Sequence, residues 1–159
     1  RLRRPGWAEA DVEVGLNGRP AARGPAGSYC VLERQWSDGD TVAFTLPLRL
    51  RSSRYQGLDA VKGCERYAFE WGPLLLGVVG PLDSRGRFIL VDQDPERPES
   101  WTRPVPGRPG RFSVSGKPDH VIVPYAEIQG EVFSCFPIFP QARVARPALP
   151  EDAPPPRTR

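Results

Sequence analysis

Apolar and polar residues alternate along most of the chain, which is the pattern of β-strands with one buried face. Val12, Val14 and Leu16 alternate with acidic or small residues near the beginning. The Asn17-Gly18 dipeptide follows directly, and both of its residues tolerate the positive φ angles of a type I′ turn. We therefore expect a β-hairpin centred on this dipeptide.

The most regular alternation runs from residue 41 to residue 50. One face carries five apolar residues: Val42, Phe44, Leu46, Leu48 and Leu50. Pro47, on the opposite face, has no N–H group to donate to a neighbouring strand. The pattern predicts one long amphipathic strand that lies at a sheet edge or contains a bulge at the proline.

An aromatic strand follows a polar connection. Tyr67, Phe69 and Trp71 share one face, and residues 74–79 are almost continuously apolar, as in a strand covered on both sides. We expect this segment to form the middle of the core. Glu70 lies on the polar face with no second acid placed opposite it, which favours a cross-strand ion pair with an arginine over a catalytic role.

Beyond Pro81 the strands become short, and stretches rich in Pro and Gly separate them. The chain contains 20 Pro and 16 Gly, which is typical of punctuated β-structure. We interpret the fold as all-β: an antiparallel, jelly-roll-like β-sandwich over residues 1–80 and a smaller C-terminal β-region over residues 81–141. Additional strands that close the first sheet are the alternative for the second part. Residues 142–159, rich in Pro and Arg, are predicted to be a disordered tail.

Asp38, Gly39 and Asp40 place two carboxylates in one turn between strands. Aspartates often cap their own backbone in turns, and glycine accepts a left-handed conformation. A calcium loop would need further oxygen ligands at alternate positions, and the neighbouring residues do not supply them. We interpret this acidic turn as structural.

Cys30, Cys64 and Cys135 are too far apart in the sequence for a zinc knuckle, and their odd number does not suit a disulfide framework. Cys30 and Cys135 lie in apolar stretches, where we expect buried, inert thiols. His120 is the only histidine, and we expect it at a solvated strand end. The residues thus predict no metal or cofactor site in this chain.

The net charge of +3 comes from 22 basic and 19 acidic residues that are interspersed along the chain. No basic stripe appears, so we expect no nucleic-acid partner. No run of 18 apolar residues occurs, so we expect no membrane partner. The chain begins with "RLRRPGW", which is neither a translation start nor a signal peptide, and we expect Arg1 to be an internal residue of a longer protein.

Several motifs in the first half resemble glycoside hydrolase family 127, the β-L-arabinofuranosidase family. The similarity is to the segment that follows the catalytic barrel, and it extends to about residue 80, with a looser likeness beyond. The matching positions are Arg3, Pro5 and Trp7; Asn17 and Gly18; Tyr29; Trp36, Asp38, Gly39, Asp40, Leu46 and Pro47; and Gly72 and Pro73.

The resemblance implies that the chemistry lies elsewhere. In that family a helical (α/α)6 barrel, encoded upstream, carries a zinc site of three Cys and a Glu, with one Cys as nucleophile and a Glu as acid/base. This chain lacks that closely spaced cysteine cluster, so we assign it no catalytic residue. The resemblance implies a non-catalytic β-sandwich that packs against the barrel, with a second subunit as a further candidate partner.

Two other functions stay open from the residues alone. One is a stand-alone carbohydrate-binding module, in which exposed aromatic rings stack on sugars. Trp101 and Tyr125 are the candidate sugar contacts. Trp36 and Trp71 are also aromatic candidates, but Trp71 shares a face with core aromatics and is therefore a weaker one. Trp101 could equally plug an end of the sandwich. The other function is assembly alone, without any activity.

Overall fold

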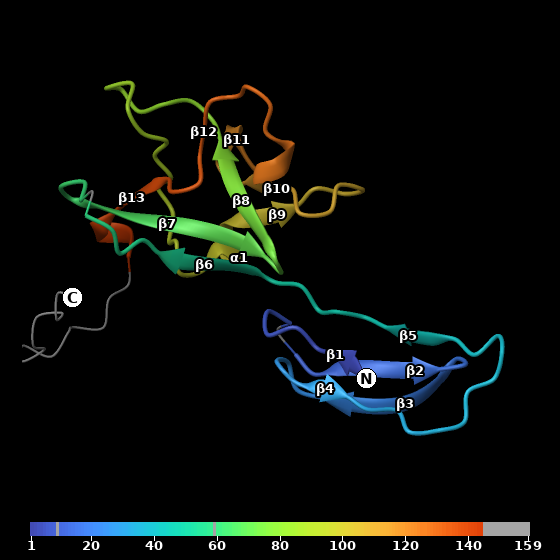
Figure 1. Ribbon diagram of the computed structural model, residues 1–159. Coiled ribbons are helices and arrows are strands. Elements are labelled where there is room, and N and C mark those ends of the chain that lie inside the picture. The colour runs from blue at the N-terminus through green and yellow to red at the C-terminus, as the bar shows by residue number, and fades with distance from the viewer. Residues whose placement is uncertain (9, 59, 145–159) are drawn as a thin grey trace, which may run out of the picture.

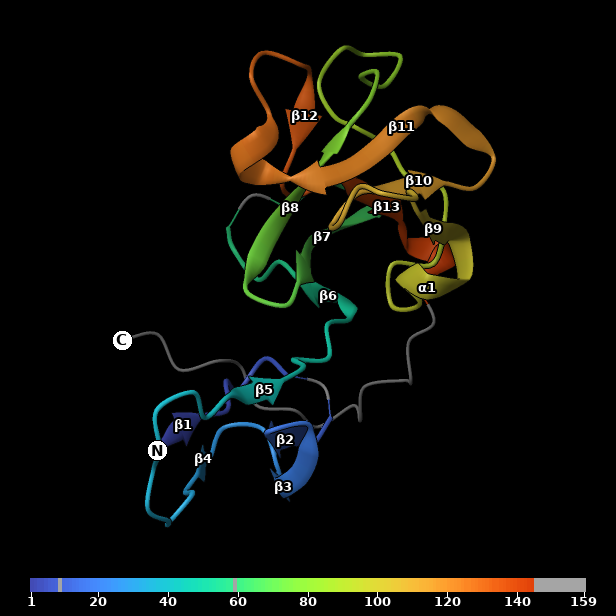
Figure 2. The ribbon, with the colours of Figure 1, turned by 90° about the vertical axis from the view of Figure 1, so that its right-hand side faces the viewer.

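The structure is a computed structural model that describes residues 1–8, 10–58 and 60–144. Strands dominate it, and the pairs between them are antiparallel, which confirms the predicted all-β class. The strands form two groups joined by one extended segment between β5 and β6 (Figure 1). Figure 2 shows the same separation after a quarter turn. No helix in the described part of the chain is long and apolar enough to cross a membrane.

The first group, here called the N-terminal unit, contains β1 to β5. Its strands are β1 (Leu2–Arg3), β2 (Val12–Leu16), β3 (Arg19–Gly24), β4 (Tyr29–Cys30) and β5 (Val42–Phe44). They form a three-stranded sheet in the order β3-β2-β5 and a separate β1-β4 pair. Asn17 and Gly18 connect β2 to β3 with φ angles of 50° and 76°, so the predicted hairpin is confirmed.

The single strand expected over residues 41–50 is wrong. The chain leaves the three-stranded sheet after Phe44, and β6 (Leu50–Arg54) pairs with a strand of the second group. Pro47 lies between the end of β5 and the start of β6. Its missing N–H and its steric demand on the preceding residue disfavour a continuous strand there. The regular alternation therefore spans two strands in different sheets.

The second group forms one curled eight-stranded sheet, here called the C-terminal sheet. Its order is β13-β7-β8-β11-β10-β9, with β6 beside β7 and β12 beside β8. Its elements are β6, β7 (Cys64–Trp71), β8 (Leu74–Val79), α1 (Pro98–Trp101), β9 (Thr102–Pro104), β10 (Phe112–Val114), β11 (Lys117–Pro124), η1 (Tyr125–Glu127), β12 (Phe133–Ser134), β13 (Ile138–Pro140) and η2 (Gln141–Arg143).

The C-terminal sheet extends across residue 80. Strands β7 and β8 precede that residue, and they pair with β11, β12 and β13, which follow it. The expected limits 1–80 and 81–141 are therefore not the limits of the sheets, and the later strands complete a sheet that begins before them. Arg143 in η2 forms an ion pair of 2.9 Å with Asp92, so the predicted tail is ordered up to this point. Residues 145–159 of that tail lie outside the described residues.

An aromatic cluster holds the C-terminal sheet together. Phe69 has its ring centroid 5.8 Å from Trp101 and 5.9 Å from Phe139, and Tyr67 lies 5.6 Å from Phe139. All four side chains are at most 3% exposed. The expectation that this segment forms the middle of the core is confirmed for Tyr67, Phe69, Leu76 and Val78. Leu74 and Leu75 are 41% and 40% exposed, so the first part of the apolar run 74–79 is not covered on both faces.

The loop between β9 and β10 lies against this core at Gly110. A Cβ atom there would come within 3.1 Å of Trp71 Cε3 and 3.2 Å of Pro124 Cγ, and the φ angle of Gly110 is 76°. Gly107, in the same loop, has a φ angle of 69° but no atom within 4 Å of such a Cβ. The two glycines thus share a left-handed backbone and differ in their surroundings.

We expect Gly110→Ala to destabilise the protein more than Gly107→Ala. Both substitutions place a side chain at positive φ, which costs roughly 1 kcal/mol, and only Gly110→Ala also crowds Trp71, which adds about 1 kcal/mol. Urea unfolding followed by tryptophan fluorescence measures the difference. Equal losses for the two variants would contradict the close packing of the loop on Trp71.

Candidate functional site

The acidic turn is tied to the Asn17-Gly18 hairpin by side-chain hydrogen bonds. Asn17 Nδ2 donates to Asp40 Oδ1 at 2.7 Å, and the Ser37 backbone N–H donates to Asp40 Oδ2 at 2.8 Å. Arg34 forms an ion pair with the same Oδ2 at 3.1 Å. Asn17 Oδ1 in turn accepts from the Thr41 backbone N–H at 2.8 Å. Both Asp40 oxygens are thus engaged within the protein, as the structural interpretation of the turn requires.

These contacts also set the charge of the turn. The hydrogen bond from Ser37 lowers the pKa of Asp40 most, followed by the bond from Asn17, and nearby Arg34 adds to the effect. Asp40 is therefore held as a carboxylate, which is the form that accepts these bonds.

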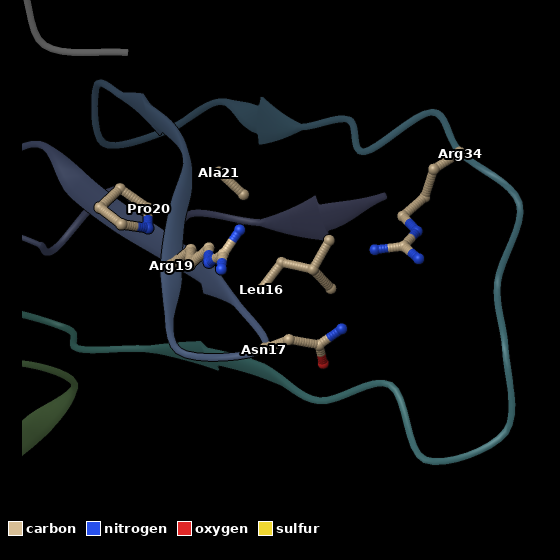
Figure 3. A pocket seen from close by; sticks show the side chains of 6 residues that line it. All are labelled: Leu16, Asn17, Arg19, Pro20, Ala21 and Arg34. Atoms are coloured by element: carbon tan, nitrogen blue, oxygen red, sulfur yellow. The ribbon is translucent and has the colours of Figure 1, made fainter.

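A cavity of about 460 Å³ lies beside this turn (Figure 3). Its lining consists of Leu16, Asn17, Arg19, Pro20, Ala21 and Arg34. Retaining glycoside hydrolysis uses two carboxyl groups, or a nucleophile and an acid, on either side of the scissile bond. None of the residues lining this cavity is an acid, a cysteine or a histidine, so the cavity offers no such pair.

The three cysteines of this chain are free and lie in two different parts of the structure. Cys30 is 3% exposed in the N-terminal unit, whereas Cys64 and Cys135 are half-buried in the C-terminal sheet. Burial raises the pKa of the Cys64 and Cys135 thiols, which disfavours the thiolate form that binds metal. The described residues contain no group of three or more His, Cys, Asp or Glu side chains that could hold a metal ion. The donors do not fit a zinc ion.

His120 is buried, so the expectation of a solvated strand end is wrong. Its side chain lies in β11 against Gly80, where a Cβ atom would come 2.7 Å from His120 Cδ2. The residue is 8% exposed, and burial lowers the pKa of its imidazole. Neither ring nitrogen has a hydrogen-bond partner among the described residues. His120 therefore acts as a neutral packing residue.

The two candidate sugar contacts lie in different environments. Trp101 is 3% exposed and donates from Nε1 to the Asp94 carbonyl at 2.6 Å, so its ring belongs to the core. Of the two alternatives for Trp101, an exposed sugar contact or a ring that plugs an end of the fold, the structure supports the buried ring, because α1 carries the side chain inward. Tyr125 is 51% exposed, with its ring 5.7 Å from that of Phe133, and it stays a candidate sugar contact.

The pairing of β6 with β7 confirms the predicted role of Glu70. Glu70 lies opposite Arg51 in the register, and its Oε2 is 3.4 Å from Arg51 Nη2. Glu70 is thus the cross-strand partner of an arginine, as predicted. Trp71, at the end of β7, is half-buried and packs on Phe112, with 6.5 Å between ring centroids.

Comparison with known families gives a match on the N-terminal unit. The model of the β-L-arabinofuranosidase GH127 middle domain matches residues 1–48. The resemblance to glycoside hydrolase family 127 is thereby confirmed. The match ends just before β6 begins at Leu50, so it covers the N-terminal unit and not the C-terminal sheet. No curated protein matches the chain.

We expect Asp40→Asn to lower the free energy of unfolding at pH 7, since an amide cannot replace both carboxylate acceptors. The folded-state pKa of Asp40 is lower than the carboxyl's usual pKa of about 3.9. The carboxylate's contribution to the free energy of unfolding is therefore fully present above the usual pKa, and it is lost as the pH falls through the lower folded-state pKa. Urea unfolding at pH 7 and pH 3 measures this. Asp38→Asn is the matched control, and a variant difference that does not shrink at pH 3 would refute the assignment.

Proposed function

We propose that the chain is the β-rich accessory part of a GH127 β-L-arabinofuranosidase-like protein and that it is not catalytic by itself. The family match over residues 1–48 supports the assignment. The described residues offer neither a cysteine-rich metal site nor a cavity with paired acids beside the acidic turn. On this proposal the reaction takes place on a helical barrel, and these strands pack against it.

The observation that carries the proposal is an apolar sheet face that the N-terminal unit covers only in part. Val14 pairs with Phe44, and Leu16 pairs with Val42, so these side chains lie on one face of the sheet. Val14 is 1% exposed, whereas Val42 and Phe44 at the β5 edge are 37% and 43% exposed. This face is therefore buried at Val14 in β2 but exposed to solvent along β5.

Further apolar side chains in the same 48 residues are exposed. They are Tyr29, Val31, Trp36 and Leu48, with exposed fractions between 37% and 61%. A sheet normally buries its apolar face against a second layer of structure, and large exposed apolar patches mark interaction sites. The C-terminal sheet, by contrast, closes around its own aromatic cluster.

A helical barrel is the partner that the family assignment suggests for this face. The face lies within the matched residues. The charged groups of the opposite face, such as the Arg23 and Asp11 pair at 3.2 Å, satisfy one another and suit contact with water. The apolar face of β5 is thus the better docking side.

We expect Phe44→Asp to weaken binding of the chain to the helical barrel of a family 127 enzyme, supplied as a separate protein. Burying a phenylalanine contributes about 1.5–3 kcal/mol, so the loss should be about tenfold or more in affinity. Leu82→Asp is the matched control, because Leu82 is also 43% exposed but lies in the other unit. Sedimentation velocity measures both. A wild-type chain that neither binds the barrel nor self-associates would contradict the docking role.

We also expect the purified chain to hydrolyse no arabinofuranoside and to carry well below one zinc ion per chain. The physical reason is that its thiols are dispersed between two units rather than gathered at one cavity. A chromogenic arabinofuranoside assay and elemental analysis of the same sample test this. Turnover that a chelator abolishes would overturn the non-catalytic assignment.

A further inference from the structure

We propose that a pocket between Trp71 and the β9–β10 loop binds a sugar unit that carries a carboxylate, such as the uronic acid of an acidic glycan. The pocket lies in the C-terminal sheet, outside the residues that match the family model. The proposal goes beyond the accessory function and does not depend on it.

The pocket has an aromatic base and a loop wall. It has a volume of about 360 Å³, and Trp71, Phe112 and residues 104–111 line it. Trp71 and Phe112 meet edge to face, at 6.5 Å and 74° between their rings. Small-molecule sites have volumes of about 300–1,000 Å³, so the pocket has room for one small ligand.

The loop that forms the wall is restricted in conformation. Three prolines fix φ within it: Pro104, Pro106 and Pro109. Gly110 packs on Trp71 and Pro124, and the Val105 backbone N–H donates to the Arg111 carbonyl at 2.9 Å. A preformed wall lowers the ordering cost of binding. Apolar walls around an indole suit the C–H face of a sugar ring, which stacks on aromatic side chains.

The charge of the pocket selects among sugars. Arg108 and Arg111 line it, and no acidic residue does. Arg111 is neutralised by Glu127, with Nη2 and Oε2 2.7 Å apart. Arg108 is exposed and has no side-chain hydrogen bond or ion pair among the described residues. Arg108 thus offers an unpaired guanidinium at the lining of the pocket, and a guanidinium binds a carboxylate through two parallel hydrogen bonds.

The test uses two methyl glycosides that differ in one group. Methyl α-D-galacturonoside carries a carboxylate where methyl α-D-galactoside carries a hydroxymethyl group. The intact 159-residue chain, labelled with 15N, is titrated with each while its four indole N–H signals are followed by NMR. We expect the galacturonoside to shift the Trp71 signal with saturation and the galactoside to bind at least several-fold more weakly.

Two other tryptophans serve as internal controls. Trp101 is buried with its indole N–H on Asp94, so its signal should stay in place. Trp36 is 52% exposed and has the Arg34 guanidinium carbon 5.4 Å from its ring centre, so it is an exposed tryptophan beside an arginine without the loop wall. Equal shifts at Trp36 and Trp71 would mean unspecific attraction and would overturn the proposed site.

Variants separate the charge from the stacking. Arg108→Ala should weaken galacturonoside binding about fivefold to tenfold, because it removes one exposed charge-assisted contact. Arg85→Ala removes an exposed arginine elsewhere and should leave binding unchanged. Trp71→Phe should weaken both ligands. Because this variant lacks the Trp71 indole, its binding is followed through the backbone amide signals of Gly110 and Arg111, which line the pocket, and an unmoved Trp101 signal reports an intact core. Equal affinity for the two glycosides, or no shift of Trp71 at high ligand concentration, would overturn the proposal.

Discussion

The contact of Phe69 with Trp101 and Phe139 is the interaction on which the C-terminal sheet depends. These residues come from β7, from α1 and from β13, at distant points of the chain. Their rings lie within 6.3 Å of one another, centre to centre, in tilted or edge-to-face arrangements that suit aromatic quadrupoles. By joining the ends of the strand order, they make the sheet curl around its own core.

The curl of the sheet also determines the environment of Trp71, at the edge of the core. Trp71 shares the face of Phe69 but lies at the end of β7, where the core gives way to the Pro-rich loop. It is therefore half-buried, and it forms the base of a pocket rather than part of the central cluster. The loop reaches it because Gly110 can approach the indole without a side chain.

The N-terminal unit is stabilised by different interactions. Its hairpin and acidic turn are held by polar side chains, chiefly Asn17 and Asp40, rather than by a large core. Val12 and Val14 are covered, but the same face stays apolar and exposed along β5. A unit that buries so little of its apolar surface is well suited to completing its core with a partner. The match to the GH127 middle-domain model falls on these same residues.

The sequence by itself determined the local features of this protein. It predicted the all-β class, the Asn17-Gly18 hairpin and the pairing of Glu70 with an arginine, because turn chemistry and two-residue periodicity act between near neighbours. Only the tertiary structure decided that the strand expected over residues 41–50 is divided between two sheets and that Trp101 and His120 are buried. Those outcomes depend on which distant strands pair, and alternation along one strand does not encode its partner. The pocket at Trp71 likewise depends on the tertiary structure, since more than thirty residues of chain separate Trp71 from the loop that forms the wall.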